Sequence, residues 1–321
     1  MKRFSAVICI IVLLTAGLCG CSGQPVSDDG LKIVCTTFPQ YDFIKNILGS
    51  DDNLSLLISN GSDLHGFEPT AKDIVEIRTA SLFVYVGGAS DLWVERTIVS
   101  TENPNLKSVA IMDYVDTLSL EDIESLEHGG HHTHDHSSHD HSHSPEDADE
   151  HIWLSIRNAI KITEGLCEEI CSLDPDNASL YRSNTAAYIE KLTALDKEYE
   201  SVFANGSRDI LLFADRFPFG YLTHDYGISH IAAFTGCSSE SEVTAETFAH
   251  LIEHTNEHKL PYVLILEGSD GKTARTVCEA TGADVLTVDS CQTVSSDDIK
   301  NGTDYLGIMT NNLEIFKEAL G

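Results

Sequence analysis

Basic residues are scarce in this sequence: 20 lysines and arginines stand against 51 aspartates and glutamates, and the formal net charge is −31. Binding to nucleic acid depends on Lys and Arg at the phosphates, and no basic patch is visible in the chain. We therefore expect no nucleic-acid partner. The acidity agrees with a cationic ligand, although acidity alone does not establish one.

The signatures of several enzyme classes are also missing. The sequence has no HExxH motif, no nucleophile elbow and no phosphate-binding loop, and it has neither a zinc-binding nor a redox CxxC pair. We therefore predict that the protein is not an enzyme. The alternative is a zinc-dependent hydrolase, for which Glu68, three residues after His65, is the candidate general base.

The apolar run at residues 4–18 is too short, and too rich in small residues at its end, for a comfortable membrane span. Cys21 follows a glycine in a sequence that resembles the cleavage site of a bacterial lipoprotein. We predict a lipoprotein signal peptide over residues 1–21, lipidation of Cys21 and a polar tether over residues 22–30. The folded part is then extracytoplasmic and anchored by lipid to the bacterial cell membrane. An ordinary secretory signal is the alternative.

Six cysteines follow position 21, and export permits disulfides without requiring them. Cys167 and Cys171 share one face of a predicted helix, which is a poor geometry for a bridge. Cys237 and Cys291 lie in predicted loops of the second half, and we predict that these two are paired. Free or buried thiols are the alternative.

Apolar runs alternate with helical patterns in both halves of the chain. Strands are predicted at residues 32–37, 54–58, 82–86, 109–112, 210–214, 228–233, 262–266 and 285–288. Continuous apolar strands separated by helices indicate parallel sheets that are covered on both faces. The predicted fold is therefore α/β, with two lobes that each contain a parallel sheet flanked by helices.

An apolar stripe with steps of three and four begins near Ala178 and predicts a helix of about 30 residues, roughly 45 Å long. A helix of this length exceeds what one lobe needs, so we expect it to join the two lobes; a coiled-coil partner is the alternative. The predicted organisation is an N-terminal lobe over residues 31–173, a linking helix over 174–205 and a C-terminal lobe over 206–321.

Eight of the 15 histidines fall within residues 128–143, among Gly, Ser, Thr and Asp. This segment has no apolar side chain for a core, so we predict a solvated loop inserted in the N-terminal lobe. Imidazoles bind zinc, copper and nickel, which favours a role in loose, secondary metal capture over a polar spacer. The eight histidines are His128, His131, His132, His134, His136, His139, His141 and His143.

Candidate metal ligands gather after the strands, where open α/β sheets bind their ligands. His65 follows the second predicted strand, and His151 stands where the chain returns to apolar sequence after the loop. In the second half, Asp215 and Asp289 end two strands. Two imidazoles from one lobe and one or two carboxylates from the other suit a divalent cation between the lobes.

Three other histidines, His250, His254 and His258, recur at intervals of four on one face of a predicted helix. This spacing permits a secondary metal site, although a solvated surface is the simpler interpretation.

Further motifs are His65-Gly-Phe-Glu-Pro-Thr, Asp149-Glu-His151-Ile-Trp-Leu, Phe219-Gly-Tyr221 followed by Tyr226-Gly-Ile, and Asp289-Ser. With the histidine-rich insertion and the long helix, they make nearly the whole mature chain resemble the metal-binding lipoproteins of bacterial ABC importers for zinc and manganese. The resemblance implies two α/β lobes, a rigid connecting helix and one metal ion in the cleft. It also implies delivery to a membrane permease driven by a separate ATPase, with His65, His151 and Asp289 as ligands. We expect a monomer.

One position departs from the family pattern. The family's third ligand, His or Glu, precedes the tyrosine of Phe-Gly-Tyr by five residues, and here that position is Arg216, which has no lone pair for a metal. Asp215 turned inward, a water molecule, or a pairing of Arg216 with Glu68, Glu242 or Glu267 are the alternatives. The predicted ligands are His65, His151 and Asp289, with Asp215 entered at the open fourth position.

The predicted function is therefore a solute-binding lipoprotein that captures Zn²⁺ and delivers it to an ABC importer. Zinc is favoured over Mn²⁺ because the predicted ligands lean towards nitrogen. The alternatives are a manganese-preferring protein of the same kind, a zinc-dependent hydrolase and a surface adhesin.

Overall fold

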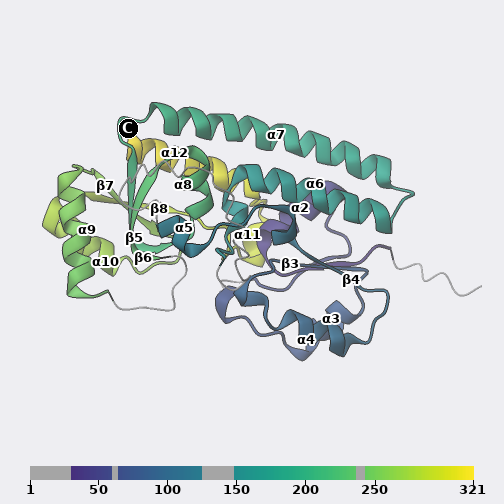
Figure 1. The fold of residues 1–321 in the computed structure, drawn as a ribbon. Helices are drawn as coiled ribbons and strands as arrows, with labels where there is room; N and C mark the ends of the chain where they lie inside the picture. Colours follow the sequence, from purple (N-terminus) through teal and green to yellow (C-terminus); the bar gives the residue numbers. More distant parts are fainter. Residues whose placement is uncertain (1–29, 60–63, 125–147, 236–242) are drawn as a thin grey trace, which may run out of the picture. The chain divides into compact units, whose positions relative to one another are not determined.

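The computed structural model describes residues 30–59, 64–124, 148–235 and 243–321. Residues Leu31–Gly321 form one compact unit, whose described part contains two four-stranded parallel sheets in the orders β2-β1-β3-β4 and β6-β5-β7-β8 (Figure 1). The strands are β1 (Ile33–Cys35), β2 (Leu54–Leu56), β3 (Leu82–Tyr85), β4 (Lys107–Ala110), β5 (Ile210–Phe217), β6 (Ser229–Thr235), β7 (Tyr262–Leu266) and β8 (Asp284–Val288). The predicted fold of two parallel-sheet lobes is confirmed.

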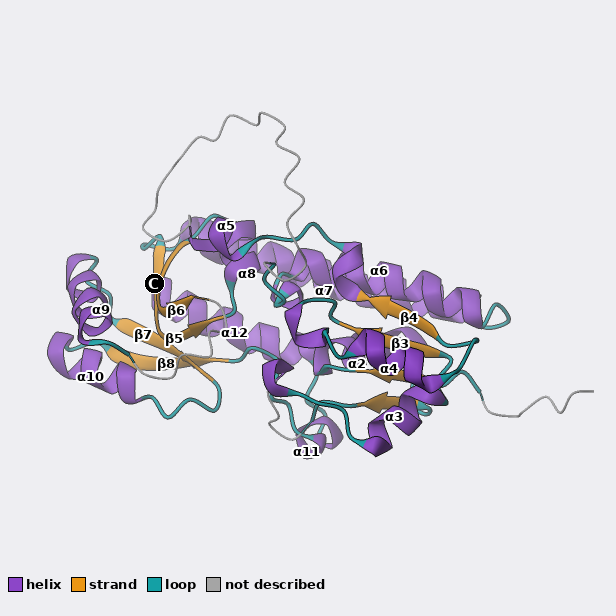
Figure 2. Ribbon diagram, turned by 60° about the horizontal axis from the view of Figure 1, so that its bottom comes forward, coloured by secondary structure: helices purple, strands orange, loops and turns teal. Residues whose placement is uncertain are grey.

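Helices flank both sheets (Figure 2). Those that precede residue 178 in the chain are α2 (Phe38–Leu48), α3 (Ala71–Arg78), α4 (Val94–Thr101), α5 (Leu120–Glu124) and α6 (Ile156–Leu173). Those that follow are α7 (Ala178–Asn205), α8 (Gly220–Tyr226), α9 (Ala245–Glu257), α10 (Lys272–Thr281), α11 (Ser296–Lys300) and α12 (Tyr305–Leu320).

Alternation of side chains along β5 divides the packing of the C-terminal lobe. Leu211 and Phe213 join a large core that also includes residues of α7 and α12 and of the N-terminal sheet. Leu212 and Ala214 point to the other face, where a separate core includes Leu251 of α9 and residues of α10. Successive residues of a strand face opposite sides of the sheet, so one apolar run serves both cores.

The long helix α7 has 28 residues and is about 42 Å long at 1.5 Å per residue. Its inward side chains hydrogen-bond to both lobes. The Tyr188 hydroxyl donates to Asp42 Oδ2 of α2 at 3.1 Å, and the Tyr199 hydroxyl donates to the Met309 carbonyl of α12 at 2.7 Å. Because these hydroxyls are buried, their bonds fix the helix to an element of each lobe.

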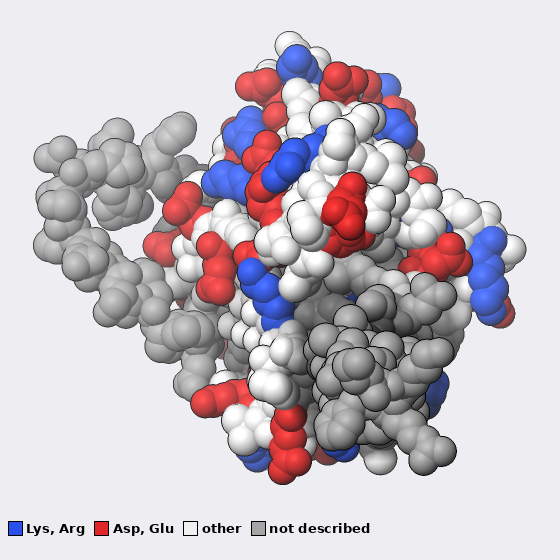
Figure 3. Space-filling model, turned by 90° about the vertical axis from the view of Figure 1, so that its right-hand side faces the viewer, with Lys and Arg blue, Asp and Glu red and all other residues white. Residues whose placement is uncertain are grey.

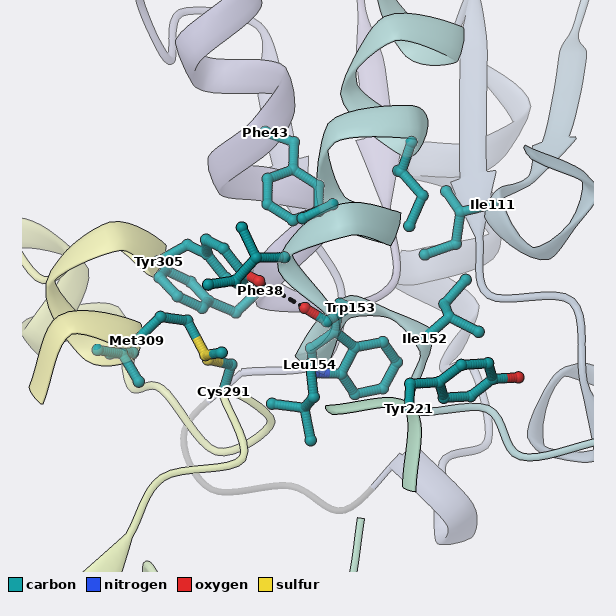
Figure 4. Close-up of a cluster of buried hydrophobic side chains, with 14 of the residues drawn as sticks. Phe38, Phe43, Ile111, Ile152, Trp153, Leu154, Tyr221, Cys291, Tyr305 and Met309 are labelled. Carbon is teal, nitrogen blue, oxygen red and sulfur yellow. Dashed lines mark hydrogen bonds between the residues drawn. The ribbon is translucent and has the colours of Figure 1, made fainter. Parts of the chain in front are cut away.

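A buried cluster joins the lobes around Trp153, which is fully buried (Figure 4). The Trp153 indole N–H donates to the Ser290 carbonyl at 2.9 Å, and the Tyr305 hydroxyl donates to the Trp153 carbonyl at 2.6 Å. Cys291 packs in the same cluster as a fully buried free thiol. The predicted pairing of Cys291 is therefore wrong in this structure, because its side chain lies in the core; Cys237 lies outside the described residues.

Two further observations concern the sequence predictions. Cys167 and Cys171 are free thiols on α6, with their sulfurs 3.9 Å apart. The strand predicted at residues 109–112 is displaced: β4 ends at Ala110, and a 3₁₀ turn follows over Ile111–Tyr114.

Charged side chains of both signs share the surface. On the face shown in Figure 3, Lys and Arg lie among Asp and Glu. Within the described ranges, no helix combines the length and the apolar character needed to cross a membrane. The predicted signal peptide, Cys21 and the eight loop histidines lie outside the described residues.

Candidate metal centre

His65 lies in a 3₁₀ turn, Leu64–Gly66, beyond the carboxyl end of β2. Its Nδ1 atom is 2.8 Å from Ser90 Oγ and 3.3 Å from Glu150 Oε2. The Ser90 hydroxyl donates its proton to Glu150 Oε2 at 2.5 Å, so its oxygen accepts from the Nδ1–H of His65. This arrangement assigns the proton of neutral His65 to Nδ1 and leaves Nε2 with a lone pair that could bind a metal.

Glu150 is buried and holds this arrangement in place. Its Oε1 atom accepts the backbone N–H of Ser90 at 2.7 Å. Burial raises the pKa of the Glu150 carboxyl, but hydrogen bonds from His65 and Ser90 outweigh burial and hold this pKa below its ordinary value. The carboxylate is therefore ionised at neutral pH and favours a cation nearby.

Gly88 provides the space for the Glu150 side chain. A Cβ atom at Gly88 would lie 2.3 Å from Glu150 Oε1 and 2.4 Å from Glu150 Cγ. These distances are shorter than any real contact, so a larger residue at position 88 must displace the carboxylate.

His151 is the second imidazole of the site, and it is only 2% exposed. Its Nδ1 atom is 2.5 Å from Asp149 Oδ1, which also accepts the backbone N–H of His151 at 3.1 Å. A buried carboxylate on Nδ1 fixes the ring orientation and presents Nε2 to a metal, as for His65. The two imidazole rings have their centroids 5.5 Å apart, so the structure brings the two predicted histidines together.

The segment that carries Asp149 is fixed by Tyr221 of the Phe-Gly-Tyr motif. The Tyr221 hydroxyl donates to the Asp149 carbonyl at 2.9 Å and accepts the Leu118 N–H at 3.0 Å. Tyr221 belongs to α8 of the C-terminal lobe and is 2% exposed. The motif therefore positions the chain next to His151 from the opposite lobe.

Two partly buried carboxylates, Glu267 and Asp289, lie at the ends of β7 and β8. Glu267 accepts the Ser290 N–H at 2.8 Å and the Ser290 hydroxyl at 2.5 Å. Burial raises the pKa of Glu267, and the charge of Asp289 raises it further. Burial also raises the pKa of Asp289, although its Oδ1 atom accepts the Cys291 N–H at 2.7 Å. The C-terminal lobe thus presents a pair of carboxylates whose repulsion a cation would relieve.

The histidine pair and this acidic pair are connected through one side chain. The Trp153 ring lies 5.4 Å from the His151 ring, and its N–H bonds to the carbonyl of Ser290, which follows Asp289. Even so, the carboxylate of Asp289 does not complete a compact set with His65 and His151. Among the described residues, only His254, Glu257 and His258 form a group of three whose ligand atoms all lie within 4.8 Å of one another.

The carboxylate of Asp215, the fourth predicted ligand, is hydrogen-bonded to backbone groups of the C-terminal sheet. It lies where the register of β5 shifts, between Phe213 and Arg216, and its two oxygens accept the N–H groups of Arg216 at 2.9 Å and Leu266 at 3.3 Å. The carboxylate therefore pairs backbone groups at an irregular point of the sheet. Asp215 and Arg216 line a cavity of about 330 Å³ together with Glu267 and residues at the start of α10.

The sequence motifs include Asp149 and Glu150 without a role, and they do not include Gly88 or Ser90. Asp149 and Glu150 carried a signal, because they directly precede a predicted ligand. Ser90 and Gly88 carried none, because they lie more than twenty residues from His65 and approach it only through the fold.

Comparison with known proteins shows to which family the chain belongs. The model of the family described as the periplasmic component A of the zinc-uptake complex, ZnuA, matches residues 33–319. The chain belongs to the ZnuA family. Arg216 stands in this chain at the position where the family resemblance implies a third ligand.

Relatives of this ZnuA-family chain include the zinc-binding lipoprotein AdcA of Streptococcus pneumoniae serotype 4, which is 32% identical over 314 residues. That match covers 96% of this chain and 60% of AdcA, so the chain spans about three fifths of the length of that relative. The high-affinity zinc uptake protein ZnuA of Bacillus subtilis is 30% identical over 318 residues, covering 99% and 96%. The Zn(II)-bound ZnuA-like domain of S. pneumoniae AdcA superposes with a TM-score of 0.72 at 28% identity, covering 90% of this chain and 98% of the domain.

Proposed function

We propose that this chain captures Zn²⁺ outside the cytoplasm and delivers it to an ABC importer. The observation that carries the proposal is the histidine pair: both imidazoles have a carboxylate in contact with Nδ1, and their rings lie 5.5 Å apart. Histidines held in this way are typical ligands of zinc, because the outer carboxylate fixes the ring and raises its basicity.

The proposed ligands are His65 and His151 through Nε2, and Asp289 from the C-terminal lobe. In the structure the Asp289 carboxylate does not form a compact group with the two imidazoles. We therefore propose that Asp289 moves towards His65 and His151 when zinc binds. A divalent cation supplies the attraction for this approach, because it neutralises the partly buried carboxylate of Asp289 beside Glu267. We assign the fourth position to solvent and keep Asp215 with the backbone amides that it already pairs.

The buried charge of the site fits a cation. Asp149 contacts His151 through one oxygen, whereas its Oδ2 atom is buried and has no hydrogen-bond partner among the described residues. An ionised carboxylate in such a position is costly unless positive charge lies close to it. Zn²⁺ bound to Nε2 of His151 would provide this positive charge across the imidazole ring from Asp149.

The names of its relatives, a zinc-binding lipoprotein and a zinc-uptake component, support a proposal for the setting of the protein. We propose a monomer, lipidated at Cys21 and held at the outer face of the cell membrane, that docks on a permease driven by a separate ATPase. We propose binding rather than catalysis, because the carboxylates of Asp149 and Glu150 are engaged in orienting the imidazoles. Turnover of ester or peptide substrates by the zinc-loaded protein would contradict this assignment.

The test is the Zn²⁺ affinity of the full mature chain, measured by competition with a chelator of known affinity. We expect His65→Gln and His151→Gln each to lower the affinity by more than the roughly 10- to 100-fold typical of outer partners. Asp289→Asn is expected to lower it as well. Asp215→Ala is expected to leave it within about twofold, since the metal does not contact this residue in our assignment.

His224→Gln is the matched control, because His224 is half exposed on α8 and pairs with Asp225. Unchanged affinity in both His65→Gln and His151→Gln would refute the site. Failure of the gene to restore growth in low zinc to a strain that lacks it, despite normal zinc binding, would refute the transport role alone.

A further inference from the structure

A second group of metal-ligating side chains lies on α9, in the C-terminal lobe. His254, Glu257 and His258 each offer a ligand atom, and these three atoms all lie within 4.8 Å of one another. We infer that this group is a second Zn²⁺ site on the surface of the protein, in addition to the site proposed at His65 and His151.

The sequence of α9 produces this face directly. Leu251 and Thr255 are buried against the sheet, and the Thr255 hydroxyl donates to the Leu251 carbonyl at 2.7 Å. With that face fixed inward, residues at intervals of three and four on the outer side come together. The ring centroids of His254 and His258 are 5.8 Å apart with the planes nearly parallel, at 16°.

A third imidazole extends the same row. The His250 ring lies 4.5 Å from the His254 ring. His254 is therefore central, with an imidazole one turn before it and another one turn after it. The His254 Nδ1 atom is 3.6 Å from Glu257 Oε2, a separation that one metal ion can bridge.

The donors suit zinc. Two imidazoles and one carboxylate make a common zinc ligand set, which is completed by water or by a third imidazole. Zn–N bonds of about 2.0–2.1 Å place tetrahedral ligands roughly 3.4 Å apart, so the group has to contract slightly. Glu257 has 63% of its side chain exposed and His258 is also exposed, so both are able to change rotamer without disturbing the core.

The position on the helix also favours a cation. Glu257 ends α9 and His258 is its C-cap residue, so the group lies at the negative end of the helix dipole. The strongly negative charge of the chain adds a long-range attraction of the same sign. These effects are modest, which points to weaker binding than at a buried site.

This site is structurally separate from the histidine pair. Leu251 of α9 belongs to the core on one face of the C-terminal sheet, whereas Ile152 and Trp153, which follow His151, belong to the core on its other face. Figures 1 and 2 show α9 beside α10 against the C-terminal sheet. Loading of the two sites is therefore expected to be independent.

The experiment uses the full mature chain labelled with ¹⁵N-histidine, titrated with zinc chloride and followed by NMR of the ring nitrogens. We expect the His254 and His258 ring signals to shift with added zinc, after those of His65 and His151. In the double variant His254→Gln/His258→Gln, one zinc equivalent should be lost while the first, tightest equivalent is retained. His224→Gln should lose none.

The reciprocal variant separates this inference from the proposed function. In His65→Gln/His151→Gln the α9 signals should still shift, although the tightest equivalent is gone. Ring signals of His254 and His258 that stay unmoved when zinc exceeds all other sites would overturn the inference. So would an unchanged zinc stoichiometry in the folded His254→Gln/His258→Gln variant, as judged by its unfolding transition.

Discussion

Gly88 leaves the space for the Glu150 side chain, on which the orientation of the proposed ligand His65 depends. The Glu150 carboxylate lies where a Cβ atom of residue 88 would be, and it holds Ser90 and His65 in one chain of hydrogen bonds. The backbone at Gly88 has φ −98°, which any residue adopts. The requirement for glycine is therefore one of space and not of backbone conformation.

We accordingly expect Gly88→Ala to displace Glu150 and to lower zinc affinity by about 10- to 100-fold, as for loss of an outer partner. The measurement is chelator competition with the purified variant. Gly66→Ala is the matched control, since a Cβ atom at Gly66 meets nothing within 4 Å and Gly66 adjoins His65 itself. Equal affinities for the two variants would show that Glu150 does not orient His65.

The attachment of α7 to α2 rests on a buried acid. Asp42 is 4% exposed and accepts the Tyr188 hydroxyl. Burial, together with the charge of Asp304, raises the pKa of Asp42 to about 6, against the lowering effect of Tyr188. In the unfolded chain the pKa of an aspartate is about 4. Between about pH 4 and pH 6, Asp42 therefore keeps its proton in the folded state and loses it in the unfolded state.

This difference predicts a pH dependence with a definite sign. Below about pH 4 both states are protonated; as pH rises towards 6, ionisation of Asp42 is easier in the unfolded state, so stability falls. Two pKa units correspond to about 3 kcal/mol. We expect the stability of Asp42→Asn relative to the native chain to rise by up to about this amount between pH 4 and 7. Urea unfolding at several pH values measures it, and a constant difference would refute the role of Asp42.

How far the sequence predicts the elements depends on where each strand lies. β7 is central in its sheet, and its predicted bounds, residues 262–266, agree with the structure. β4 is an edge strand that begins at Lys107 and Ser108, polar residues that an apolar run does not include. β5 continues past Ala214 through Asp215 and Arg216, where its register shifts. The apolar pattern therefore fails to predict strand ends that contain polar residues, either at a sheet edge or where the register shifts.

The same limit applies to the site. The sequence predicted the proximity of His65 and His151, because both follow positions where parallel strands end, and the structure confirms it. The partners of Nδ1 could not be assigned in this way, since Ser90 approaches His65 only through the packing of two 3₁₀ turns. The position of Asp289 relative to the histidines depends on the contact between lobes, which no local pattern encodes.

Considered as a whole, the described chain has one continuous core that includes residues of both sheets and of α7. Hydrogen bonds from α7 to α2 and α12 add to this connection. A wide hinge opening would expose that core to water, at a free-energy cost that one bound ion does not offset. Capture of zinc is therefore expected to move the lobes only slightly.

The histidine-rich segment, residues 128–143, is expected to bind zinc separately from the tight site. Deletion of residues 128–143 should reduce the number of zinc ions bound, because eight imidazoles are lost. The tightest binding event should keep its affinity. Calorimetry on the full mature chain with and without the segment measures both quantities. An identical stoichiometry for the two proteins would remove the role in metal capture from this segment.

Trp153 connects the segments that carry the two proposed ligands His151 and Asp289. The residue stands two positions after His151, its indole is bonded to the chain that follows Asp289, and its carbonyl is bonded to the first residue of α12. A small shift of the C-terminal lobe is therefore expected to move the backbone next to both proposed ligands, His151 and Asp289, together and without separation of the lobes.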